Sequence, residues 1–228
     1  MTSLHATKLI RIWDLPTRVF HILLILSITG LFITGELIDD AMRFHFWFGY
    51  TLLALVFFRL TWGFVGGHWS RFMHFIPSPS KLLAYVRSVR LKQAPLHAGH
   101  NPLGALSVLS MLVVLLLQVF SGFLSDDEIS NSGPWVDLVS SQWVELATNY
   151  HTEIGKVLLI ALIALHIATA LYYKQVKKTD LISPMLHGDK ELSIDTPHSR
   201  DTYTSRLFAL SIFVACAYAV FRLVNIAS

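Results

Sequence analysis

Cysteine and charged residues are scarce in this chain. Of its 228 residues one is a cysteine, Cys216, and 14% are charged, whereas 54% are hydrophobic. A single cysteine excludes an intramolecular disulfide and any CxxCH motif. The small charged fraction and the mean hydropathy of +0.54 exclude an ordinary soluble domain. The composition therefore predicts a protein that crosses a membrane several times.

Five apolar segments are long enough to cross about 30 Å of hydrocarbon, which takes about 20 helical residues. They are residues 17–36, 43–66, 102–124, 151–173 and 206–227. Lipid cannot hydrogen-bond a free backbone, so each of these segments should be helical. We therefore predict an all-α membrane protein.

The charges are unevenly divided between the connecting loops. Five basic residues and no acidic one lie in the loop 67–100, namely Arg71, Lys81, Arg87, Arg90 and Lys92. Eight acidic residues lie in the loops on the opposite side with one basic residue, Arg43; they are Glu36, Asp39, Asp40, Asp126, Asp127, Glu128, Asp137 and Glu145. Because basic loops stay in the cytoplasm, we expect a cytoplasmic N-terminus and a periplasmic C-terminus.

Four histidines lie inside the apolar segments. His151 and His166 are fifteen residues apart in one segment, which in a regular α-helix places them about 22 Å apart along the axis and about 60° apart around it. His21 lies near the cytoplasmic end of the first segment, and His45 begins the second segment at the outer side. Matching by depth pairs His21 with His166 and His45 with His151.

Two imidazoles at one depth can serve as the two axial ligands of a heme iron, which then carries single electrons. Without a CxxCH motif, such a heme would be bound non-covalently as heme b. The four histidines therefore predict two b hemes. The alternative is that they are ordinary intramembrane histidines bonded to backbone carbonyls, but each of the four carries a desolvation cost.

Other polar residues lie near these histidines. Arg18, one helical turn before His21, and Arg59 are candidates to bind a heme propionate, and Lys156 is a candidate for the outer heme. Each of these side chains has the alternative of extending to the lipid headgroups. His100 is a candidate quinone-site residue because histidine exchanges protons near neutral pH, or it is a loop residue beside a helix cap.

Several strings in the chain are similar to a known family. They are IRIWDLPTRVFH, FRLTWGFVGGHWSRF, GHNPLGALSVL, HTEIGKVLLIALIALH and DLISPMLHGDK. The chain resembles the bacterial cytochrome b561 family, whose relatives include the b-type subunits of membrane-bound nickel–iron hydrogenases. The resemblance implies a four-helix core with two b hemes, ligated from the first, second and fourth helices through His21, His45, His151 and His166.

The third helix supplies no ligand in that pattern, and the fifth lies outside the core. The expected division is a diheme four-helix membrane domain over residues 1–175, a cytoplasmic linker over 176–205 and a fifth transmembrane helix over 206–228.

The leading functional prediction is a multi-pass carrier of electrons in the bacterial inner membrane. Quinol would donate the electrons, and a soluble periplasmic c-type cytochrome would accept them. Whether the chain is then an enzyme, a quinol:cytochrome oxidoreductase, stays open. The alternatives are the membrane anchor of a periplasmic oxidoreductase such as a hydrogenase, and a superoxide:quinone oxidoreductase. Acidic outer loops favour a basic cytochrome over the superoxide anion. No nucleic-acid partner is expected.

Overall fold

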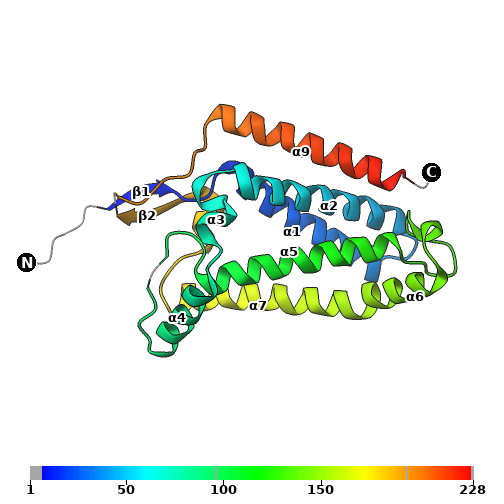
Figure 1. Ribbon diagram of the computed structural model, residues 1–228, viewed down its shortest axis with the longest axis horizontal. Helices are drawn as coiled ribbons and strands as arrows, with labels where there is room; N and C mark the ends of the chain where they lie inside the picture. Colours follow the sequence, from blue (N-terminus) through cyan, green and yellow to red (C-terminus); the bar gives the residue numbers. More distant parts are fainter. Residues whose placement is uncertain (1–6, 96, 194, 227–228) are drawn as a thin grey trace, which may run out of the picture. The chain divides into compact units, whose positions relative to one another are not determined.

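Long helices dominate the computed structural model, which describes residues 7–95, 97–193 and 195–226 (Figure 1). In this part of the chain five helical stretches are long and apolar enough to cross a membrane. They are α1 (Leu15–Glu36), α2 (Met42–Val65), α5 (Pro102–Phe123), the stretch Ser141–Gln175 and α9 (Tyr203–Val224). These helices confirm the prediction of an all-α membrane protein.

The fourth membrane helix begins ten residues before the apolar run that predicted it. It consists of α6 (Ser141–Asn149), the π-helical turn η3 (Tyr150–Gly155) and α7 (Lys156–Gln175). The segment α6 is amphipathic, because the polar Gln142, Glu145 and Asn149 alternate with apolar residues such as Trp143 and Leu146. A search for continuous apolar sequence misses such a segment because its polar face lowers the mean hydropathy. The π-turn also means that the 60° estimate, made for a regular α-helix, does not apply to His151 and His166.

The described residues form two compact units. Of the described residues, the first unit contains 7–19, 60–109 and 166–210, and the second contains 20–59, 110–165 and 211–226. Each of the five long helices contributes one end to each unit. The predicted division into residues 1–175, 176–205 and 206–228 stays a prediction.

The first unit contains a small sheet that the sequence did not predict. Strands β1 (Thr7–Arg11) and β2 (Asp189–Ser193) pair antiparallel, with Arg11 opposite Asp189 (Figure 1). The Arg11 guanidinium also forms ion pairs with Asp189 at 2.7 Å and Asp201 at 2.9 Å. The predicted linker therefore contains β2 and α8 (Ile182–His187). Pairing between residues about 180 positions apart depends on tertiary contacts, which local sequence patterns do not reveal.

A buried carboxylate joins several elements of this unit. Asp14 is 0% exposed, and it accepts hydrogen bonds from Thr17 N at the start of α1 and from Gly67 N after α2. Its oxygens also accept from the indole N–H of Trp62 and from Ser70 Oγ in η1 (His68–Ser70). Because a buried charge is costly without such partners, Asp14 ties the helix ends of this unit together. The short helices α3 (Phe72–Phe75) and α4 (Pro79–Arg90) follow η1.

The second unit contains the most buried part of the membrane helices. Half of the most apolar window of α2 is buried, compared with 22% or less in the other four helices. Phe58 of α2 contacts Phe20 of α1 and Phe213 of α9, with ring centroids 6.4 and 6.2 Å apart. Trp135, just before η2 (Val136–Leu138), donates its indole N–H to Leu223 O at the end of α9. In this unit α2 is therefore the central helix, and it carries His45.

Candidate functional site

His45 lies in the first turns of α2 with its ring held by α1. Its Nδ1 lies 3.1 Å from the carbonyl oxygen of Leu31, within hydrogen-bond distance. A Cβ added to Gly35 on α1 would lie 2.9 Å from His45 ring atoms. Glycine at this position therefore lets α1 approach the imidazole closely. The hydrogen bond to a carbonyl requires a proton on Nδ1, so Nε2 is the nitrogen available to a metal ion.

His151 is held in the same way by a different helix. It lies in the π-turn η3, and its Nδ1 is 2.8 Å from the carbonyl oxygen of Gln118 on α5. A Cβ added to Gly122 of α5 would lie 2.8 Å from the His151 ring. Each of the two histidines is thus bonded through Nδ1 to a backbone carbonyl and packed against a glycine on a neighbouring helix. Its Nε2 is again the nitrogen available to a metal ion.

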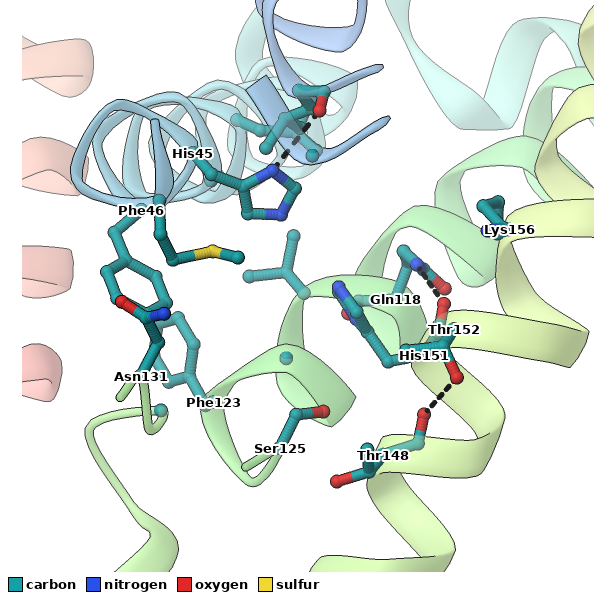
Figure 2. A pocket seen from close by; sticks show the side chains of 18 of the residues that line it. His45, Phe46, Gln118, Phe123, Ser125, Asn131, Thr148, His151, Thr152 and Lys156 are labelled. Carbon is teal, nitrogen blue, oxygen red and sulfur yellow. Dashed lines mark hydrogen bonds between the residues drawn. The ribbon is translucent and has the colours of Figure 1, made fainter. Parts of the chain in front are cut away.

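The two rings face the same cavity (Figure 2). Their centroids are 6.2 Å apart and their planes are inclined by 78°. Two imidazoles bonded to one metal ion from opposite sides, at about 2.0–2.1 Å each, have ring centroids about 6 Å apart. The observed centroid separation of His45 and His151 matches the length that such a pair of ligands requires.

The cavity has a volume of about 260 Å³ and a mostly apolar lining that includes Leu31, Phe46 and Phe123. Its polar lining residues include Ser125, Asp126, Asp127, Asn131, Thr148, Thr152, Glu36 and Lys156. An apolar interior with a group of polar side chains suits a porphyrin, which has an apolar ring and two carboxylates. Figure 2 shows Lys156, Thr148 and Asn131 among the residues that surround the two imidazoles.

His21 and His166 lie where the sequence expected them, on α1 and α7. His21 belongs to the second compact unit and His166 to the first. Both side chains are partly buried. Their pairing stays a prediction.

Lys156 is an expected propionate partner, and its ammonium lies beside the cavity. Its Nζ is 2.9 Å from Glu36 Oε1, and the two side chains are 31% and 48% exposed. The ion pair joins α1 to α7. Partial exposure leaves the ammonium accessible to a second carboxylate as well.

The other three expected site residues lie outside this cavity lining. Arg18 donates to Leu186 O at 3.1 Å, and its Nε is buried. Arg59 is 3% exposed, which argues against extension of its side chain to the lipid headgroups. His100 lies between two aromatic rings, with centroid distances of 4.8 Å to Trp13 and 5.1 Å to Phe75.

Sequence reasoning missed the contribution of the third membrane helix. That helix, α5, has no histidine, yet Gln118, Ser121 and Gly122 all contact His151. A signal was present, because Gln118 is an amide within a helix of mean hydropathy 2.5 over its most apolar window. Intramembrane polar residues usually face a functional interior. Gly35 and Gly122 carried no comparable signal.

These observations define a multi-pass membrane protein in which two imidazoles line one cavity. In the described residues no group of three or more histidine, cysteine, aspartate or glutamate side chains is placed to hold a metal. An iron held by its porphyrin needs two protein ligands only, so the histidine pair fits a heme better than a free metal ion.

The family comparison agrees with this class of protein. The family model for prokaryotic cytochrome b561 matches residues 12–188, and the chain belongs to that family. It is therefore a b-type membrane cytochrome, a heme protein of membrane electron transfer.

Several relatives are described as probable Ni/Fe-hydrogenase B-type cytochrome subunits. The one from Azotobacter chroococcum mcd 1 is 28% identical over 216 residues, which cover 82% of this chain and 90% of the relative. The one from Bradyrhizobium diazoefficiens is 25% identical, with 79% and 85% covered. The one from Rhodobacter capsulatus is 24% identical, with 86% of each covered. No solved structure matches the chain.

Proposed function

We propose that the chain binds two b hemes and carries electrons across the inner membrane. The iron of the outer heme is held by His45 and His151, and that of the inner heme by His21 and His166. The observation that carries the proposal is the 6.2 Å separation of the His45 and His151 rings. The carbonyl partners of their Nδ1 atoms support it, because they leave Nε2 for the metal.

The proposed electron donor is a quinol at the cytoplasmic side. His100 supports the proposal of a quinol donor, because its imidazole can exchange protons near neutral pH and lies in an aromatic environment with Trp13 and Phe75. Arg59 and the basic loop 67–100 belong to the same side under the topology that the charges predict. The N-terminus is then cytoplasmic and the C-terminus periplasmic.

The proposed electron acceptor is a soluble periplasmic c-type cytochrome with a basic docking face. The exposed acids Glu128, Asp137 and Glu145 support it, because opposite charges speed association. The same acids argue against superoxide as the substrate, since an anion is repelled by a surface of its own sign.

Difference spectroscopy with heme quantification tests this function. The purified protein should contain two b hemes per chain, and a quinol as well as dithionite should reduce them. His45→Ala and His151→Ala should each remove the same heme, and His21→Ala and His166→Ala should each remove the other. If His21→Ala and His151→Ala emptied one and the same site, the pairing would be wrong. A chain that binds a single heme would refute the diheme proposal.

A second candidate function is the membrane anchor of a periplasmic oxidoreductase such as a hydrogenase. The descriptions of the relatives favour it, as do the exposed side chains of Leu138, Trp143 and Leu146, at 53%, 60% and 58%. A permanent partner buries such an apolar patch. Co-purification of a stoichiometric large subunit that resists high salt would favour this candidate over the soluble cytochrome.

A further inference from the structure

Gln118 and His151 form a reciprocal pair of hydrogen bonds between α5 and η3. The side-chain Nε2 of Gln118 donates to the backbone carbonyl of His151 at 2.8 Å. The backbone carbonyl of Gln118 lies 2.8 Å from Nδ1 of the His151 ring. One residue on α5 therefore binds both the backbone and the ring of the histidine.

The orientation of the Gln118 amide follows from its partner. A carbonyl oxygen accepts hydrogen bonds only, so the nitrogen of the amide must face His151 O and the oxygen must face away. The Gln118 Oε1 atom is buried and has no hydrogen-bond partner among the described residues. Leaving a buried oxygen in this state is costly. The buried oxygen without a partner belongs to the residue that holds His151. Such unsatisfied groups are typical of functional positions.

Gly155 makes room for this arrangement. A Cβ added to Gly155 would overlap with Gln118 Oε1 and would lie 2.7 Å from the Tyr150 ring. Gly155 is also the last residue of the π-turn that contains His151. Single π-turns within α-helices occur frequently at functional sites. The π-turn, the glycine and the glutamine thus act on the same histidine.

We propose that Gln118 is a positioning residue that fixes the ring orientation and the Nδ1 hydrogen bond of His151, and thereby sets the midpoint potential of the outer heme. This proposal rests on the proposed function, in which His151 is an axial ligand. A hydrogen bond from Nδ1 to a carbonyl raises the basicity of the imidazole. A more basic ligand stabilises ferric iron and so lowers the potential. The Gln118 side chain acts indirectly, because its bond to His151 O holds η3 where the ring Nδ1 reaches the backbone carbonyl of residue 118.

The test measures the two midpoint potentials and the ferric EPR signals of three single variants against the parent. Gln118→Met keeps the volume of the side chain and removes the donor. Gly155→Ala keeps the glutamine and displaces it from His151. Gln175→Met is the matched control, because it makes the same exchange at the exposed end of α7.

We expect Gln118→Met and Gly155→Ala each to raise the midpoint potential of the outer heme and to broaden or shift its EPR signal. The potential of the inner heme and the heme content should stay unchanged, and Gln175→Met should change neither heme. Relative to Gln118→Ala alone, a Gln118→Ala/Gly155→Ala double variant should show a smaller effect of the glycine exchange than the parent does. The overlap with Gln118 Oε1 is then gone, and only the contact with the Tyr150 ring remains.

If both single variants keep their hemes and the outer heme shows the potential and EPR signal of the parent, the positioning role is wrong. The proposed function is not affected by that result. A parent protein without a heme at His45 and His151 would overturn the proposed function itself. If Gln118→Met fails to fold, Gly155→Ala and the double variant decide between these outcomes. Loss of the outer heme in both single variants would contradict the positioning role, because it would show that Gln118 is needed for the site to form.

Discussion

The imidazole ring of His45 is nearly perpendicular to that of His151, with 78° between the two planes. Each orientation is set by a separate carbonyl, Leu31 O for one ring and Gln118 O for the other. Both ring orientations are therefore set by hydrogen bonds within the protein.

Perpendicular axial imidazoles leave two iron d orbitals nearly equal in energy, which gives ferric heme a strongly anisotropic low-spin EPR signal. We expect the oxidised protein to show such a large-g signal, and His45→Ala or His151→Ala should abolish it. A rhombic signal typical of parallel rings, lost in the same variants, would contradict the observed ring geometry.

The ion pair between Lys156 and Glu36 should tune the same heme. Lys156→Met leaves the Glu36 carboxylate unpaired near the cavity, so the outer midpoint potential should fall because negative charge favours ferric iron. Glu36→Gln should raise it for the opposite reason. Because the pair is partly exposed, either change should alter the free energy of unfolding by no more than about 1 kcal/mol. Redox titration and thermal unfolding measure the two effects, and shifts of equal sign in both variants would contradict the electrostatic account.

Removal of the Asp14 carboxylate should destabilise the first compact unit. Asp14→Ala leaves the donors of Trp62, Thr17, Gly67 and Ser70 without their buried acceptor. We expect a loss of about 2–5 kcal/mol in the free energy of unfolding. Unfolding in detergent, followed by tryptophan fluorescence, measures this loss. Asp195→Ala, at an exposed position, is the control and should change little.

The Asp127 carboxylate should stabilise its own loop through hydrogen bonds. Hydrogen bonds from the backbone and side chain of Asn131, and from the amides of Ser130 and Ile129, hold the pKa of Asp127 well below its ordinary 3.8. Because the pKa of Asp127 is lower in the folded state, its ionised carboxylate stabilises the fold. This contribution to the free energy of unfolding is fully present above pH 3.8 and is lost only as pH falls through the lowered value. Carboxyl NMR titration of Asp127 checks the direction. Asp127→Ala should speed amide exchange at Ile129, Ser130 and Asn131, and unchanged exchange would show that the loop is held otherwise.

The role of Asp127 also decides which acids test the docking of a basic cytochrome. Neutralising Asp127 would disturb the loop, whereas Glu128, Asp137 and Glu145 are exposed. Electron transfer to a basic c-type cytochrome should slow as salt rises from about 0.01 to 0.15 M, because screening acts beyond about 8–10 Å. Exchange of these three acids for their amides should flatten the dependence without changing either heme spectrum. A rate indifferent to both changes would favour the anchor function.

The membrane class, the five long helices and the placement of four histidines in them follow from the sequence alone. Apolar length is a property of a continuous segment, so it can be read without knowledge of contacts. The family strings supported the same conclusion, and the family match confirmed it. Matching by depth also predicts His45 and His151 as partners.

The contacts that hold these histidines follow from the packing of the helices and not from any one segment of the sequence. Residues distant in the sequence meet in three places. Strand β1 pairs with β2, Asp14 is buried against Gly67, and Gln118 bonds to His151. The same holds for Gly35 and Gly122, whose missing side chains matter only because an imidazole from another helix lies against them. Periodicity and hydropathy describe one segment at a time, whereas these interactions exist only after the segments pack.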